Sequence, residues 1–234
     1  MKAIAKKELR SYFLSPIGYV FLGVILFLFG LYFYQVLRIG SSSYLPEVYG
    51  TMFIWSMMFL PILTMRSFSD ETRNHTDQGL LTAPVSVGGI VFGKFLAAFC
   101  VFAIAMGLSL LSIVIISFFS SLGWAMIIGN VVGSLLYGAA MIAIGIFISS
   151  LTQSQITAAI STFGVSILLL VINQLSSLVT NSAISSLLNW ISFNSRYQPF
   201  TKGIFNLSSI VFFLSVVAVF LFLTARKLES KRWS

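Results

Sequence analysis

The sequence predicts a single all-α membrane domain, over residues 1–234, that crosses the bilayer with six helices. Of its 234 residues, 58% are hydrophobic and 9% are charged, whereas soluble domains carry about 25% charged residues. No Lys, Arg, Asp or Glu occurs between Lys94 and Arg196. Because a hydrocarbon core about 30 Å thick requires roughly 20 apolar residues per helix, this uncharged interval alone accommodates three spans. A polytopic α-helical membrane protein is the fold class that follows.

The charge and cysteine content narrow the function classes further. The formal net charge is +8, but the basic residues gather at the two chain ends and in one loop, which indicates topology rather than a nucleic-acid surface. The single Cys100 excludes a disulfide framework and a cysteine-based metal site. The first apolar run begins near Ile17 and is too long for the core of a signal peptide, so we expect it to remain as the first span.

The first 15 residues predict an amphipathic helix that lies in the headgroup plane. Cations occupy one face of this helix and apolar side chains the other, so the cations can contact lipid phosphates. Ser15-Pro16 should end the helix, because proline cannot continue the hydrogen-bond ladder. A basic flank that only fixes orientation is the alternative interpretation. The basic face holds Lys6, Lys7 and Arg10, and the apolar face holds Ile4, Leu9, Tyr12 and Phe13.

The six expected spans cover residues 17–37, 49–65, 87–119, 124–151, 155–179 and 207–224. The fourth span carries small residues at regular spacing, which lets helix backbones approach closely and predicts tight packing against neighbouring helices. Gly129 and Gly133 are the first of these residues. Between the last two spans, residues 180–206 alternate apolar and polar side chains, so we expect short amphipathic or re-entrant helices on the extracytoplasmic side.

The distribution of basic residues predicts the orientation. With six spans, one side receives both termini, residues 66–94 and the 152–154 turn, which together hold all of the 14 Lys and Arg residues except Arg38, Arg196 and Lys202. Loops rich in Lys and Arg stay in the cytoplasm. Both termini should therefore be cytoplasmic.

The sequence does not favour an enzyme with an active site inside the membrane. Catalysis there would require a nucleophile with a base, paired acids or a metal motif, yet the only histidine, His75, lies in the 66–86 loop and no expected span contains a carboxylate. We therefore expect neither catalytic nor metal-binding residues. Neutral Asn173 and Gln174 remain; they can bond neighbouring helices or contact a substrate. No phosphate-binding loop occurs, so any ATP hydrolysis belongs to another chain.

Two stretches carry a resemblance that covers nearly the whole chain: KELRSYFLSPIGYV at residues 7–20 and ETRNHTDQGLLTAPVSVGGIVFGK at residues 71–94. The order of features resembles the membrane subunit of type-2 ABC exporters, in the branch of the gliding-motility and copper-enzyme-maturation permeases. The resemblance implies that the 66–86 loop holds a coupling helix, which docks on a cytosolic ATPase. Gly79 lowers helix propensity by about 1 kcal/mol, so that helix should be short or bent. The implied docking residues are Glu71, Arg73, Asn74, Thr76, Asp77, Gln78, Leu80 and Leu81.

The same resemblance implies the partners. It predicts two copies of a cytosolic ATPase subunit, which bind ATP and Mg²⁺, and a second permease subunit, identical or similar to this one. The expected location is the inner or plasma membrane of a bacterium, in contact with lipid. The sequence does not identify the substrate, and only the resemblance indicates export. It also leaves open whether an extracytoplasmic helper subunit takes part.

Two competing hypotheses remain for the protein as a whole. For residues 66–94 alone, the alternative to a docking element is an ordinary amphipathic loop packed on its own bundle. A non-transporting scaffold would merely recruit a soluble partner through that loop; it would tolerate bulky substitutions at Gly129, Gly133 or Asn173, whereas a moving permease would lose coupled ATPase activity. An ion-coupled carrier or channel would require a polar pore or ionisable groups in the bilayer, and the expected spans offer little for either.

Overall fold

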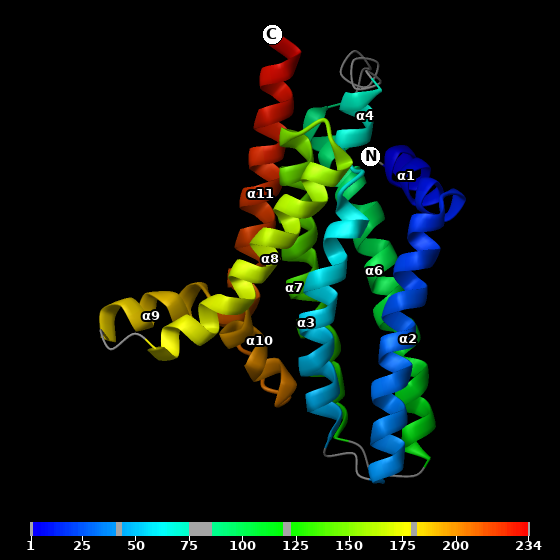
Figure 1. The fold of residues 1–234 in the computed structure, drawn as a ribbon, viewed down its shortest axis with the longest axis vertical. Helices are drawn as coiled ribbons and strands as arrows, with labels where there is room; N and C mark the ends of the chain where they lie inside the picture. Colours follow the sequence, from blue (N-terminus) through cyan, green and yellow to red (C-terminus); the bar gives the residue numbers. More distant parts are fainter. Residues whose placement is uncertain (1, 41–43, 75–85, 119–122, 179–181, 234) are drawn as a thin grey trace.

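The computed structural model describes residues 2–40, 44–74, 86–118, 123–178 and 182–233, and the regular elements of these residues are all helices (Figure 1). The predicted all-α class is therefore confirmed. In chain order the helices are α1 (Lys2–Leu14), α2 (Pro16–Ile39), α3 (Leu45–Thr64), α4 (Ser69–Arg73), α6 (Val87–Ser117), α7 (Trp124–Leu151), α8 (Gln155–Leu178), α9 (Ser182–Ile191), α10 (Phe193–Thr201) and α11 (Leu207–Trp233).

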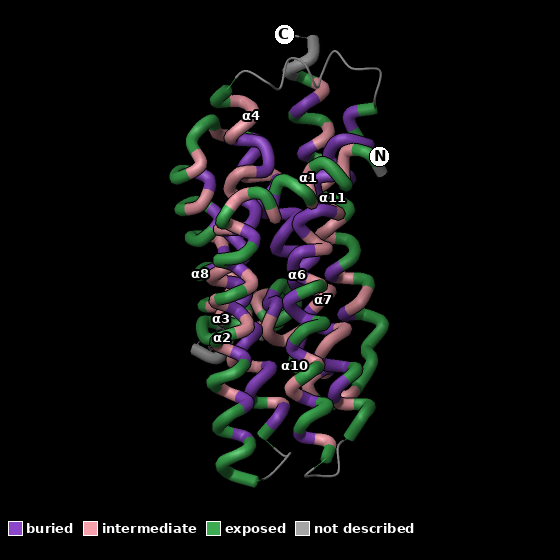
Figure 2. The backbone as a smooth tube through the Cα atoms, turned by 90° about the vertical axis from the view of Figure 1, so that its right-hand side faces the viewer, coloured by how far each residue is buried: buried purple, intermediate pink, exposed green. Residues whose placement is uncertain are grey.

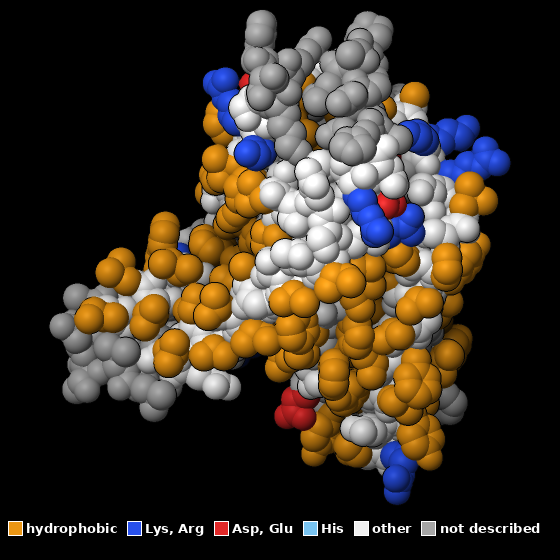
Figure 3. Space-filling model, turned by 45° about the horizontal axis from the view of Figure 1, so that its top comes forward, with side chains coloured by type: hydrophobic (Ala, Val, Ile, Leu, Met, Phe, Trp, Pro, Cys, Tyr) orange, Lys and Arg blue, Asp and Glu red, His pale blue; other side chains and the backbone are white. Residues whose placement is uncertain are grey.

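Six of these helices, α2, α3, α6, α7, α8 and α11, are long and apolar enough to cross a membrane. The long helices other than α7 carry buried residues on one side and exposed residues on the other (Figure 2), as expected when one side faces protein and the other faces lipid. Figure 3 shows hydrophobic side chains spread over the flank of the molecule, while most of the visible Lys and Arg side chains gather at one end. The chain is thus a multi-pass membrane protein.

Several helix boundaries differ from the sequence-based expectation. Helix α3 begins at Leu45 rather than near residue 49, with Pro46 in its first turn, where the missing N–H of proline removes no helical bond. Helix α2 ends at Ile39 and is capped by Gly40, whose φ of 70° is left-handed and whose N–H donates to the carbonyl of Val36. Helix α11 continues through the basic tail to Trp233 instead of ending at Thr224.

Helix α7 is the central element of the bundle, and α3, α6, α8, α10 and α11 all contact it. Buried aromatic rings fill the space around it: Tyr137 of α7 lies edge-on to Phe53 of α3 at 4.6 Å and to Tyr197 of α10 at 5.2 Å, measured between ring centroids. All three rings are buried. The core therefore joins the spans to the segment between α8 and α11.

The bundle has two different ends (Figure 1). One end, called here the terminal end, holds α1, α4 and the C-terminal part of α11. In the other half of the bundle, α10 turns back against α7 while α9 projects sideways from it. The segment expected to be amphipathic or re-entrant thus forms two short helices within the described residues, α9 and α10.

Candidate functional site

A buried lysine marks the terminal end. Lys94 is the eighth residue of the otherwise uncharged α6, and 2% of its side chain is exposed. Its ammonium lies 3.1 Å from Glu8 Oε1 of α1 and 2.8 Å from Glu71 Oε1 of α4. The ring of Phe68 lies beneath the same ammonium, at 5.0 Å from its centroid. One cation therefore joins three helices that are distant in the sequence.

The charges of this cluster do not cancel. Two carboxylates, with 17% and 16% of their side chains exposed for Glu8 and Glu71, share the single ammonium of Lys94. A buried ion group is stable only when each member keeps its partners, because an unpaired charge loses its hydration without compensation. Lys94 is thus the member that both carboxylates contact.

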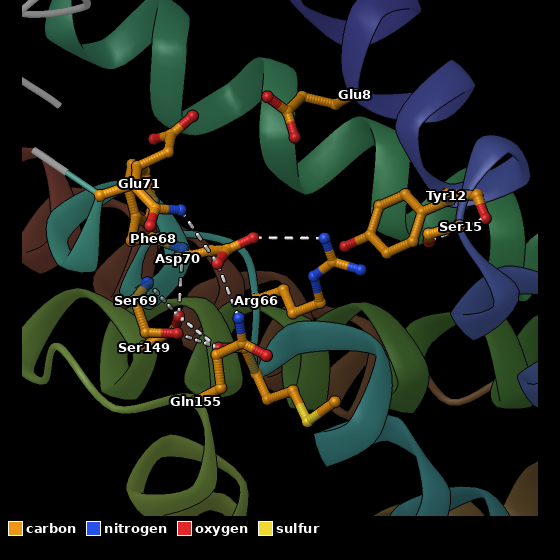
Figure 4. Close-up of polar contacts among 12 residues, drawn as sticks. Glu8, Tyr12, Ser15, Arg66, Phe68, Ser69, Asp70, Glu71, Ser149 and Gln155 are labelled. Atoms are coloured by element: carbon orange, nitrogen blue, oxygen red, sulfur yellow. Dashed lines mark hydrogen bonds and ion pairs between the residues drawn. The ribbon is translucent and has the colours of Figure 1, made fainter. Parts of the chain in front are cut away.

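A buried serine ties α4 to α7 (Figure 4). The Ser149 hydroxyl accepts the backbone N–H groups of Phe68 and Ser69, both at 3.1 Å, and donates to the carbonyl of Met65 at 3.1 Å. The first N–H groups of a helix have no partner within the helix. Ser149 therefore supplies, from another helix, the cap that α4 requires.

Asp70 extends the same network to α8. Its carboxylate accepts the side-chain amide of Gln155 at 2.7 Å and pairs with Arg66 at 3.2 Å, and Figure 4 shows these side chains converging below α4. We refer to the whole set of contacts as the α4 junction. It consists of Glu8, Phe68, Ser69, Asp70, Glu71, Lys94, Ser149 and Gln155.

Helix α1 is seated on the bundle through its apolar face. The Tyr12 hydroxyl donates to the carbonyl of Leu63 at 2.9 Å, and burial raises the pKa of Tyr12 to about 12. Ile4 packs on Gly93: a Cβ atom added at Gly93 would lie 3.0 Å from Cγ2 of Ile4. Phe13 is half-buried, with its ring edge-on to Tyr19. Lys6, Lys7 and Arg10 are exposed on the opposite face.

The structure separates the residues that sequence reasoning had grouped as docking contacts. Glu71 points inward to Lys94 and is largely covered, whereas Arg73 and Asn74 are exposed at the end of α4. The remaining predicted contacts lie outside the described residues. They are Thr76, Asp77, Gln78, Leu80 and Leu81.

The residues proposed for helix packing or a pathway are also separated. Gly129 and Gly133 of α7 are buried against α10, where Cβ atoms would meet Phe200. Gln174 is exposed near the end of α8. The side chain of Asn173 lies outside the described residues.

Sequence reasoning missed Glu8, Ser149 and Gln155 as members of the α4 junction. Serine and glutamine near helix ends are common, so their types gave no signal. Lys94 did offer one, because a charge several residues inside an apolar helix is expensive unless it is paired. Its partners could have been sought among the five acids expected on the same side, which include Glu8 and Glu71.

A pair of adjacent serines tests the role of the Ser149 cap. Ser149→Ala should lower the free energy of unfolding by about 2 kcal/mol, because two buried N–H groups lose their acceptor. Ser150→Ala is the matched control, since the Ser150 hydroxyl is equally buried but donates only within α7, to Phe147. Thermal unfolding of both variants in detergent measures the difference. Equal stabilities would show that Ser149 does not hold α4.

Comparison with known proteins bears on the whole chain. Among proteins with curated descriptions, none matches it significantly. Residues 2–231 match the profile of the family described as "ABC-2 family transporter protein". Members of such a family are membrane components of transport that work with an ATPase subunit. The match covers nearly the full length, including the α4 junction and the segment between α8 and α11, and the chain therefore belongs to the ABC-2 transporter family.

Proposed function

We propose that this chain is the permease subunit of an ABC exporter, in which two cytosolic ATPase subunits drive alternating opening of a pathway between two permease subunits. ATP and Mg²⁺ would be held by the ATPase subunits, and this chain would supply no catalytic group. ATP-driven closure of the ATPase pair would push α4, and the spans would tilt in response.

The observation that supports this proposal most strongly is the way α4 is held. Its five residues are joined by the α4 junction to α1, α6, α7 and α8 at once. A loop that only connected two spans would need none of these buried contacts. A force applied to α4 is instead passed directly to three membrane helices and to α1.

The proposed orientation places the terminal end in the cytoplasm of a bacterium, with the protein in its inner or plasma membrane. The described Lys and Arg side chains lie mostly at the terminal end, and positive residues favour the cytoplasmic side. Helix α1 would then lie at the cytoplasmic headgroups, with Lys6, Lys7 and Arg10 toward lipid phosphates.

The outward face of α8 is the best candidate for contact with a second permease subunit. Thr157, Ser161 and Gly164 are exposed on this face, and small residues of this kind are enriched where membrane helices pack together. An apolar groove of about 360 Å³ lies beside it, between α3 and α8, lined by residues such as Trp55 and Phe163. The exposed residues of α6 from residue 101 to its end, except Gly107, are by contrast bulky apolar side chains suited to lipid.

Co-purification tests the proposal. The tagged protein is extracted from native membranes in mild detergent, and co-eluting proteins are identified by mass spectrometry and assayed for ATPase activity. We expect a stoichiometric ATPase with a phosphate-binding loop. Arg73→Glu should reduce its recovery at least tenfold, because Arg73 is exposed at the end of α4 and forms no ion pair within the described residues.

Lys227→Glu is the control, since Lys227 is an exposed cation at the same end but on α11. Glu71 is unsuitable for charge reversal, because the change would also break its bond to Lys94. Recovery of the wild-type chain without any ATPase would refute the exporter proposal and favour a scaffold or a carrier.

A further inference from the structure

A second polar site lies far from the α4 junction, where α9, α10 and the start of α11 meet. It is a pocket of about 360 Å³, and Asn189, Trp190, Arg196, Asn206 and Ser209 are among the residues that line it. Packing of α9 and α10 against the bundle does not explain why these polar side chains gather around one pocket.

Arg196 is fixed at this pocket by neutral groups. Its Nε donates to the carbonyl of Trp190 at 3.2 Å and a terminal nitrogen donates to the Ser208 hydroxyl at 2.8 Å. The guanidinium also lies over the rings of Trp190 and Phe212, at 5.6 and 5.3 Å from their centroids. These contacts orient the side chain but do not neutralise its charge.

The pocket is positive and has donors to spare. No carboxylate of the described residues pairs with Arg196, and its bonds to Trp190 and Ser208 occupy only part of its donor set, since a guanidinium has five N–H groups. The buried hydroxyl of Ser209, in the pocket wall, has no hydrogen-bond partner within the described residues. A fork of N–H donors without a counterion matches the oxygens of a phosphate or carboxylate.

The level of the pocket in the membrane identifies which anion it meets. Helix α11 is uncharged from Leu207, beside the pocket, to Thr224, a length of about 27 Å that nearly equals the hydrocarbon thickness. The pocket therefore lies in the half of the bundle away from the terminal end, and α2, α3, α6 and α7 continue beyond it (Figure 1). Helix α9 projects sideways at this level (Figure 1) with Leu187, Trp190 and Ile191 exposed, as a helix in the interface does.

We propose that this pocket binds the phosphate group of a membrane phospholipid headgroup, with Arg196 as its principal ligand. The inference goes beyond the proposed transport function and does not depend on it. A lipid held there would attach the re-entrant segment to the lipid leaflet on that side and keep α9 in the interface.

Two variants test the proposal from opposite directions. Arg196→Gln removes the charge. Asn206→Asp keeps the local fold, because Asn206 accepts the N–H of Ser208 at the start of α11 and aspartate caps a helix equally well, but it places a competing carboxylate in the pocket. Lys202→Gln is the matched control, since Lys202 is exposed at the end of α10 and does not line the pocket.

The measurement is native mass spectrometry of the purified full chain in detergent, titrated with phosphatidylglycerol and with diacylglycerol, which lacks phosphate. We expect phosphatidylglycerol to bind and diacylglycerol not to bind. Arg196→Gln and Asn206→Asp should each weaken phosphatidylglycerol binding about tenfold or more, as loss of a charge-assisted contact does, while Lys202→Gln changes it by less than about twofold.

Competition distinguishes a lipid headgroup from a free phosphate. Inorganic phosphate and glycerol-1-phosphate should not displace the lipid at millimolar concentration; displacement would overturn the lipid assignment in favour of a small phosphate ligand. Unchanged phosphatidylglycerol binding in Asn206→Asp, with the fold intact by circular dichroism, would overturn the site itself. That variant decides the matter even if Arg196→Gln does not fold.

Discussion

Lys94→Met is expected to destabilise the protein by about 3 kcal/mol and to abolish ATP-coupled transport. The variant keeps the volume of the side chain but removes the ammonium that the largely buried Glu8 and Glu71 share, and breaking such a group from one side is costly. It also disconnects α4 and α1 from α6. Thermal unfolding in detergent and substrate-independent ATPase activity of the reconstituted complex measure the two effects.

Neutralising one acid should cost much less, because Lys94 keeps the other. Glu8→Gln and Glu71→Gln are therefore the comparison variants, and each is expected to lower the free energy of unfolding by less than about 1 kcal/mol. The combination Glu8→Gln with Lys94→Met should be less destabilised than the sum of its parts, as residues of one network are not additive. Additive effects, or a stable Lys94→Met, would contradict the role assigned to the cluster.

Gly129→Ala is expected to have the next largest effect, about 2 kcal/mol of destabilisation. A Cβ at this position would lie 2.5 Å from the carbonyl oxygen of Phe200 and 3.1 Å from the Cα of Gly203. Both atoms belong to the backbone, so no rotamer change relieves the clash and α10 must shift away from α7. Thermal unfolding of the variant in detergent measures the loss.

Gly164→Ala is the control for Gly129→Ala. Gly164 lies in α8, and a Cβ there would meet nothing within 4 Å, so the change should be neutral or stabilising, because alanine favours helix over glycine by about 1 kcal/mol. A Gly129→Ala protein as stable as Gly164→Ala would mean that α10 is not held closely against α7.

The position of Gly129 also alters an experiment suggested by the sequence. Bulky substitutions at Gly129 and Gly133 were expected to separate a moving permease from a static scaffold. Since both glycines are covered by α10, such substitutions disturb the fold under either hypothesis. Substitutions at Lys94 and its two acids distinguish a permease from a scaffold better, because Glu8→Gln and Glu71→Gln should each leave the fold intact.

The lengths of the apolar runs were sufficient to predict the fold class and all six long helices, because span length follows from bilayer thickness. Boundaries were less accurate: the second span was expected to begin near residue 49, yet α3 begins at Leu45, with Pro46 in its first turn. The last span was expected to end at residue 224, but α11 continues through the basic tail, where the charges at positions 226 and 229 pair along the helix.

The site was predicted only in outline, because its contacts join residues up to 86 positions apart. The sequence indicated that residues 66–94 were important, and Arg73 and Asn74 are indeed exposed there. It could not show that Glu71 turns inward, since the direction of that side chain depends on where α6 brings Lys94. Nor could it pair Ser149 with α4, because that contact requires knowing which helices are neighbours.

Helix α6 makes the position of Lys94 mechanically significant. From Lys94 to its far end at Ser117 the helix is continuous, which gives a rigid arm of about 35 Å. If the α4 junction acts as a pivot, a tilt of roughly 10° would displace the far end by about 6 Å, more than one helical turn along its axis. A change at α4 too small to repack any single contact would then be amplified into a shift as wide as a lipid acyl chain on the other side of the membrane.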